Sequence, residues 1–203
     1  MVDTKSLRCV IGILGMLLPI IVAVLSLVYG YGFPDSVSAT YFIPTCITPF
    51  MIILGASGIL LCVYRGYDIV DNILNTLAGI GAWLVCLFPC AATDADKVGT
   101  FQIDKWISDD IHLVAALGFF GILAFNSLFQ FTKGEKYPTE RKKKRNLIYI
   151  VCGVGMLLSF SLIAIDKLWT IPHVIWVVET IALFFFGLSW LTKANCIKFL
   201  FAD

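Results

Sequence analysis

The chain reads as six long apolar runs separated by short polar connections. The runs cover residues 9–30, 43–64, 73–92, 111–131, 147–165 and 172–192. Each has about the 20 mostly apolar residues that an α-helix needs to cross the hydrocarbon core of a bilayer. With their connections they take up nearly all of residues 1–203. The pattern therefore predicts a single transmembrane domain, an all-α, integral membrane six-helix bundle.

The composition favours a membrane protein over a soluble one. Hydrophobic residues make up 59% of the chain and charged residues only 14%, whereas a soluble domain has roughly 25% charged residues. Nucleic-acid binding is excluded because the basic residues that cluster do so beside apolar runs. The seven cysteines include no CxxC pair. We interpret them as small buried side chains.

The basic residues predict the orientation, because Lys and Arg accumulate in cytoplasmic loops. With the N-terminus inside, twelve of the fifteen basic residues lie on the inner side and three on the outer side. The outer connections are instead acidic. We therefore expect cytoplasmic N- and C-termini and, by default, a prokaryotic plasma membrane. The inner residues are Lys5, Arg8, Arg65, Lys133, Lys136, Arg141, Lys142, Lys143, Lys144, Arg145, Lys193 and Lys198, and the outer ones are Lys97, Lys105 and Lys167.

A run of five basic residues directly precedes the fifth apolar run. It consists of Arg141, Lys142, Lys143, Lys144 and Arg145. Such a run anchors the topology of the adjacent span. It is also suited to contact anionic lipid headgroups, where each basic residue near the surface contributes about 1 kcal/mol. The two interpretations are compatible.

Glu179 is an ionisable residue at membrane depth, and such residues are costly and suggest a function. It lies about 10 Å beyond Pro172, where the last run begins, at 1.5 Å per residue. We expect it to face the bundle interior or a wet cavity and to have a partner. A structural hydrogen bond to another helix and a ligand-binding or catalytic carboxylate both fit this position.

Both histidines open predicted spans at the outer side. His112 opens the fourth span and His173 the sixth. A zinc site needs three or four well-placed ligands, and the chain has no HxxH or HxxxH pair. We therefore expect neither a metal nor another cofactor, and these histidines are either interfacial residues or parts of a binding site.

Other polar residues lie at the same predicted membrane level. Ser38 and Tyr41 are three apart, so on a helix their hydroxyls would share one side. Helix capping also explains polar residues ahead of apolar runs. If these residues converge, they form an outward-facing pocket suited to a lipid headgroup or a small polar ligand. The expected ligand-binding residues are Glu179, His112, Ser38, Tyr41, Asp109 and His173.

The order of short motifs resembles a family of uncharacterised bacterial six-span membrane proteins and, more distantly, the damage-regulated autophagy modulator and Sfk-type membrane family. The resemblance covers nearly the whole chain. It implies a six-helix bundle with cytoplasmic ends, a role in lipid handling, trafficking or scaffolding, and a shared site at Ser38, His112 and Glu179. The motifs are Pro34-Asp35-Ser36-Val37-Ser38, Tyr64-Arg65-Gly66-Tyr67, Leu87-Phe88-Pro89, Ile111-His112-Leu113-Val114-Ala115-Ala116, Trp176-Val177-Val178-Glu179 and Phe186-Gly187-Leu188-Ser189-Trp190.

Three functions stay open at this point. The leading hypothesis is a non-enzymatic protein that binds a lipid or another small amphiphile in the outward-facing pocket. The first alternative is an intramembrane hydrolase or lipid-modifying enzyme with His112 and Glu179 as acid and base. The second is a transporter or channel subunit, which would need polar residues along a continuous path. Membrane lipids are the expected partners, with a homo-oligomer or a membrane-protein partner left open.

Overall fold

The computed structural model describes residues 3–134, 139–169 and 172–197, with side chains in the fifth helix up to Leu162. In this part of the chain the regular secondary structure is helical apart from one small hairpin, as the sequence predicts. Five of its helices are long and apolar enough to cross a membrane, and a sixth apolar helix is shorter. The helices are α1 (Thr4–Val28), η1 (Ser38–Phe42), α2 (Ile47–Val63), α3 (Ile69–Leu87), α4 (Lys105–Phe125), η2 (Asn126–Gln130), α5 (Glu140–Trp169) and α6 (Val174–Lys193).

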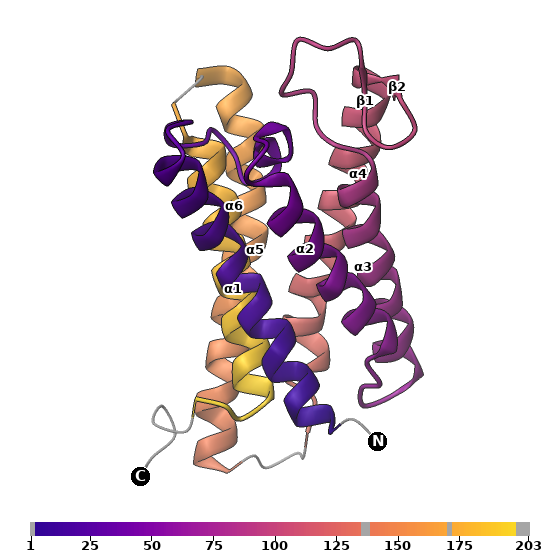
Figure 1. Cartoon of the computed structure of the whole chain (residues 1–203). Coiled ribbons are helices and arrows are strands. Elements are labelled where there is room, and N and C mark those ends of the chain that lie inside the picture. The colour runs from indigo at the N-terminus through magenta and orange to yellow at the C-terminus, as the bar shows by residue number, and fades with distance from the viewer. Residues whose placement is uncertain (1–2, 135–138, 170–171, 198–203) are drawn as a thin grey trace.

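The long helices form a closed ring. Each packs on its neighbours in the chain, and α6 closes the ring by packing on α1. The connection before α2, the hairpin and the start of α6 lie at one end of the bundle (Figure 1). The start of α1, the turn between α2 and α3, and the end of α6 lie at the other. We call these the hairpin end and the basic end.

Glycines allow the closest helix contacts. A Cβ atom added to Gly12 of α1 would lie 2.8 Å from the carbonyl oxygen of Gly187 in α6. On the other side of the ring, a Cβ atom added to Gly79 of α3 would lie 2.5 Å from the carbonyl oxygen of Gly58 in α2. Backbones can approach this closely only where no side chain intervenes. The two glycine pairs therefore set the spacing of α1–α6 and of α2–α3.

The second helix is shorter than its apolar run. The run covers 43–64, but α2 begins at Ile47 because the preceding residues form η1, a 3₁₀-helix, and a turn. At 1.5 Å per residue, α2 is about 25 Å long. The residues before α2 lie instead at the hairpin end of the bundle, where Ser36, Val37 and Ser38 line a cavity.

Helices α1, α3, α4 and α5 begin earlier than the apolar pattern predicts, whereas α6 begins two residues later, at Val174. Asp68 caps α3 by accepting a hydrogen bond from the backbone N–H of Asp71 at 2.9 Å, so α3 begins at Ile69 rather than residue 73. Asp104 caps α4 in the same way through Trp106. α5 begins at Glu140, which places the whole basic run inside the helix. In the predicted polar connection 93–110, the strands β1 (Lys97–Val98) and β2 (Ile103–Asp104) form an antiparallel hairpin.

Candidate ligand-binding site

Glu179 connects α6 to the segment before α2. Its Oε1 atom accepts a hydrogen bond from the hydroxyl of Ser38 at 2.8 Å. Its Oε2 atom accepts hydrogen bonds from the backbone N–H of Val37 at 2.5 Å and of Ser38 at 3.4 Å. These N–H groups belong to the start of η1, where backbone donors lack partners within the helix. The carboxylate therefore satisfies both the hydroxyl and the exposed backbone of this turn.

His112 holds the same serine from α4. Its Nε2 atom lies 3.1 Å from the Ser38 hydroxyl, and its Nδ1 atom lies 2.9 Å from the carbonyl oxygen of Phe88. Phe88 is the residue that follows α3 and caps its C-terminal end. The His112 side chain is buried, with 7% exposed. One chain of hydrogen bonds thus joins the end of α3, α4, η1 and α6.

Counting donors and acceptors leaves two possible arrangements of the protons along the hydrogen bonds that connect Phe88, His112, Ser38 and Glu179. A carbonyl oxygen only accepts, so His112 Nδ1 carries a proton. In one arrangement an imidazolium Nε2 donates to Ser38, which donates to an ionised Glu179. In the other, Ser38 donates to a neutral imidazole and a protonated Glu179 donates to Ser38. The two arrangements have the same net charge and differ by the transfer of two protons through one hydroxyl.

The first turns of α4 hold the neighbouring connection in place. Asp109 Oδ1 accepts a hydrogen bond from the backbone N–H of Ala91 at 2.9 Å. The hydroxyl of Ser108 donates to the carbonyl oxygen of Pro89 at 2.7 Å. These bonds keep the chain after α3 beside the start of α4, and they fix the carbonyl that orients His112.

A cavity of about 360 Å³ lies inside the ring at the hairpin end. Its deeper wall is apolar, and its outer part is polar. The exposed residues Asp35 and Ala92 mark its outer opening. Glu179 is half-buried, and it lines this cavity. The apolar wall includes Leu18, Phe50, Leu54, Val85, Leu113, Ala116, Phe119, Phe120, Phe160 and Leu183, and the polar part includes Asp35, Ser36, Ser38, Asp109, His112 and Glu179.

Four of the six predicted ligand-binding residues therefore line one cavity. Tyr41 and His173 are not among the described residues that line it. The ring of Tyr41 packs edge-on against Phe42 and Phe50, and burial raises the pKa of its hydroxyl. A 3₁₀-helix places residues three apart on one side, so the packing of the Tyr41 ring on Phe42 and Phe50, rather than the helix period, sets it apart from the residues that line the cavity.

His173 joins the first outer connection to the start of α6. It is exposed, and its Nδ1 atom lies 3.1 Å from a carboxylate oxygen of Asp35 and 3.3 Å from the carbonyl oxygen of Pro34. Its backbone φ is 57°, in the left-handed region. The backbone N–H of Trp176 also donates to the carbonyl oxygen of Asp35, at 3.0 Å. His173 thus contributes to holding the outer rim of the cavity.

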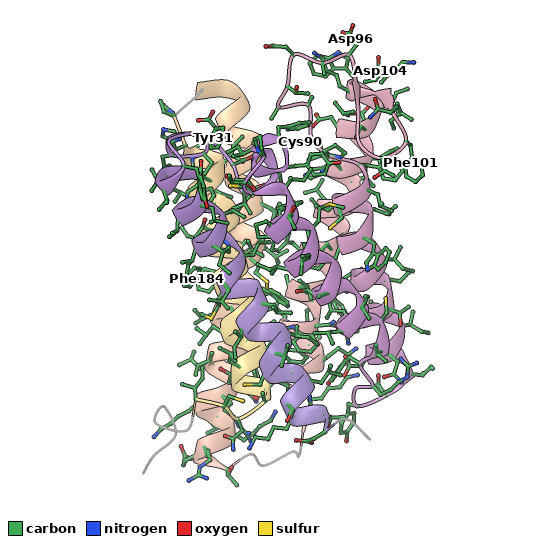
Figure 2. The ribbon with its side chains drawn as sticks, in the orientation of Figure 1. Tyr31, Cys90, Asp96, Phe101, Asp104 and Phe184 are labelled. Carbon is green, nitrogen blue, oxygen red and sulfur yellow. The ribbon has the colours of Figure 1, made fainter. Side chains whose placement is uncertain are left out.

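Cys90 also lines the cavity, which the sequence did not indicate. It follows α3 and lies at the hairpin end, as do Asp96 and Asp104 (Figure 2). Burial raises the pKa of its thiol to about 12. The thiol is therefore protonated at neutral pH and adds little charge to the polar part of the cavity.

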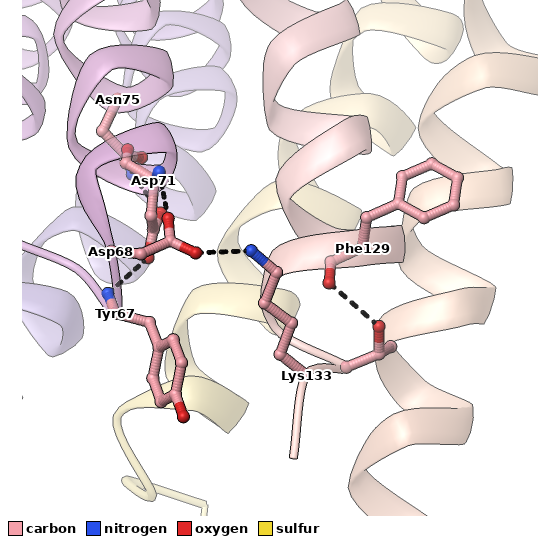
Figure 3. A network of polar contacts seen from close by, with 7 residues as sticks. Tyr67, Asp68, Asp71, Asn75, Phe129 and Lys133 are labelled. Atoms are coloured by element: carbon pink, nitrogen blue, oxygen red, sulfur yellow. Dashed lines mark hydrogen bonds and ion pairs between the residues drawn. The ribbon is translucent and has the colours of Figure 1, made fainter.

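A second polar network, at the basic end, was missed because the apolar pattern began the third span at residue 73. The Asp71 carboxylate is buried and accepts hydrogen bonds from the backbone N–H of Tyr67 at 2.9 Å and from the Asn75 amide at 2.6 Å. The space that a Gly66 side chain would need is filled by this carboxylate. Asp68 pairs with Lys133 at 2.6 Å (Figure 3). The capping spacing of Asp68 and Asp71 was the available signal for the true helix start.

The residues of the basic run point in different directions. Lys142 is half-buried and donates to the carbonyl oxygen of Phe131 at 3.0 Å, and Arg145 is half-buried one turn later. Lys143 is exposed and pairs with Glu140 at 2.7 Å. Arg141 and Lys144 are exposed. Of the other predicted inner residues, Lys136 and Lys198 lie outside the described residues.

Comparison of the chain with protein-family models, with curated proteins and with solved structures finds no match. The functional argument therefore depends on the site itself.

Proposed function

We propose that this protein crosses a membrane six times, with both termini in the cytoplasm, and binds a lipid or another small amphiphile in the cavity at its hairpin end. The twelve-to-three distribution of basic residues supports the orientation. The basic end of the bundle then faces the cytoplasm and the hairpin end faces outward. A prokaryotic plasma membrane is the membrane we infer, with lipid handling or scaffolding as the cellular role.

The shape and lining of the cavity carry this proposal. Ligand pockets have volumes of about 300–1,000 Å³ and combine an apolar wall with a few polar groups that orient the ligand. Here the volume is about 360 Å³, the deep wall is aliphatic and aromatic, and His112, Ser38 and Glu179 meet at the outer part. An amphiphile fits this distribution with its apolar tail between the helices and its polar group at the hydrogen-bond chain.

The test is native mass spectrometry of the full chain purified in detergent. Glu179→Gln and His112→Ala change the polar part of the cavity. Asp110→Asn is the matched control at the same end, because Asp110 is exposed and is not among the described residues that line this cavity. We expect a co-purifying amphiphile in the unaltered protein and in Asp110→Asn, and its loss from both cavity variants.

Retention of the amphiphile in Glu179→Gln and His112→Ala would overturn the proposal, as would its equal loss from Asp110→Asn. Size-exclusion chromatography of each variant separates loss of ligand from loss of fold.

A second function, lipid hydrolysis, is favoured by one observation. In the arrangement with a protonated Glu179, His112 Nδ1 donates to Phe88 and the neutral ring presents the lone pair of Nε2 to the Ser38 hydroxyl at 3.1 Å. This is the arrangement of a nucleophile and its general base. A fluorophosphonate probe should then label Ser38 and fail to label Ser38→Ala and His112→Ala. An unlabelled Ser38 in folded protein would leave ligand binding as the function of the site.

A further inference from the structure

Four aromatic side chains form one cluster at the basic end of the bundle, opposite the cavity. Tyr64, Phe131, Tyr149 and Trp190 are all buried. The ring centroids are 5.0 Å apart for Tyr64 and Trp190, 5.5 Å for Phe131 and Trp190, and 5.5 Å for Phe131 and Tyr149. The cluster joins the end of α2, the end of η2, α5 and α6. We call it the aromatic cluster.

Three basic side chains from three helices lie against the rings of this aromatic cluster. The Arg8 guanidinium is 5.4 Å from the centre of the Tyr64 ring, and its Nε donates to the Tyr64 hydroxyl at 3.1 Å. Lys142 Nζ is 5.7 Å from the Tyr149 ring, and Lys193 Nζ is 4.9 Å from the Phe131 ring. The three helices are α1, α5 and α6, so no single sequence motif contains the group.

Arg145 completes the group. It follows Lys142 by three residues, so both share one face of α5. The Nε atom of Arg145 is buried and has no hydrogen-bond partner among the described residues. The Asp71 carboxylate at the same end of the bundle already accepts two hydrogen bonds. It is therefore engaged with its own helix and the preceding turn, while four basic side chains gather at this end.

Buried polar atoms without partners concentrate around this group. Among the described residues, a buried side-chain atom that lacks a partner calls for a ligand, an ion or water to satisfy it. All but one of these atoms outside Arg145 belong to residues of η2, the first turns of α5 or the last turns of α6. They are Asn126 Oδ1, Gln130 Oε1, Asn146 Oδ1, Trp190 Nε1 and Thr192 Oγ1, with Thr180 Oγ1 as the exception. Trp190 Nε1 and Thr192 Oγ1 can donate to an anion, as Arg145 Nε can, whereas the three amide oxygens accept and call for water or another donor.

We propose that the basic end of the bundle binds a phosphate group among Arg8, Lys142, Arg145 and Lys193. Cation–π contacts offset only a small part of the repulsion among four clustered cations. A bound phosphate group offsets this repulsion directly, because guanidinium and ammonium groups form strong charge-assisted hydrogen bonds to its oxygens. A phospholipid headgroup and a free phosphate ester offer the same chemistry. This site differs from surface contact by the exposed basic residues Arg141, Lys143 and Lys144.

The test is a native mass spectrometry titration of the full chain in detergent. The probes are dioleoyl phosphatidic acid and, as the zwitterionic comparison, dioleoyl phosphatidylcholine. Lys193→Gln and Arg8→Gln each remove one cation from the group, while Lys143→Gln removes one from the exposed face of α5. We expect each of the first two to weaken phosphatidic acid binding about tenfold, the effect of one hydrogen bond to a charged group. Lys143→Gln should change it much less.

Inorganic phosphate distinguishes the two sources of the group. If millimolar phosphate displaces the lipid, the site recognises the phosphate alone; if it does not, the site recognises a lipid headgroup with its chains. Equal weakening by Lys143→Gln, or equal binding of phosphatidylcholine, would overturn the proposal. If Lys193→Gln does not fold, Arg8→Gln and the charge-conserving Arg8→Lys carry the test, with binding lost in the first and kept in the second. Asp110→Asn, at the other end and outside the lining of the cavity, should leave this binding unchanged.

Discussion

Ser38 and Glu179 are 141 residues apart in the chain and share a hydrogen bond of 2.8 Å. The bond fastens the segment before α2 to the second turn of α6, at the lining of the cavity. The carboxylate also accepts from two backbone N–H groups of the same turn. The side chain is therefore a structural connection as well as part of the binding site, and its substitution should affect both stability and binding.

Glu179→Ala should destabilise the protein more than Glu179→Gln. The alanine variant leaves three donors of Val37 and Ser38 without their acceptor, and each unsatisfied buried group costs about 1–3 kcal/mol. Glutamine keeps one acceptor oxygen. Thermal unfolding in detergent, followed by size-exclusion chromatography, measures the order. Equal melting temperatures for Glu179→Ala and the unaltered protein would show that these hydrogen bonds do not hold η1 to α6.

Cys90 should react slowly with iodoacetamide at pH 8, since the thiolate is the reactive species. Burial raises the pKa of the thiol to about 12, so only a small fraction is ionised. The rate should rise about tenfold per pH unit until the pH nears that value. Peptide mass spectrometry quantifies the modification, with the exposed Cys196 as the internal reference. Alkylation of Cys90 as fast as that of Cys196 at pH 8 would contradict the burial of this thiol.

The apolar pattern predicted the helical fold because lipid-facing and buried helix residues must both be apolar. It did not predict helix ends that begin with polar residues. Asp71 and Asn75 lie on the buried face of α3, where they satisfy each other and the preceding turn. A prediction from hydrophobicity assigns such polar residues to the connection between two spans. In the structure, the cap at Asp68 starts the helix before them, so they belong to α3.

The candidate site was predicted in part for a related reason. Ser38, His112 and Glu179 were grouped by membrane depth, which helix length determines well. Depth does not determine which face of the segment carries each side chain, so Tyr41 was grouped with them although its ring packs on Phe50. The basic group proposed to bind phosphate could not be predicted from the sequence at all. Arg8 and Lys193 come to the same end of the bundle only because α6 closes the ring against α1.

Lys133→Gln should reduce stability at pH 7 and have less effect in acid. The Lys133 ammonium, with the backbone N–H of Asp71, lowers the pKa of Asp68 below its ordinary value of 3.8. A lowered carboxyl pKa stabilises the folded state above that ordinary value, and the contribution disappears as the pH falls through the lowered pKa. Unfolding measured from pH 7 down to below that lowered pKa compares the two proteins. A difference that persists unchanged below it would show that Lys133 acts other than through Asp68.

Gly187→Ala should destabilise the bundle by separating α1 from α6. The new Cβ atom would lie 2.6 Å from the carbonyl oxygen of Gly12, a backbone atom that cannot move alone. Such overpacking costs about 1–3 kcal/mol. Gly121→Ala is the matched control, because an added Cβ atom there meets no atom within 4 Å and alanine favours a helix over glycine. Thermal unfolding should therefore show a lower melting temperature for Gly187→Ala and an equal or higher one for Gly121→Ala. If both variants melted alike, the close contact of Gly12 and Gly187 would not hold α1 against α6, and the ring would have to close through the surrounding side chains instead.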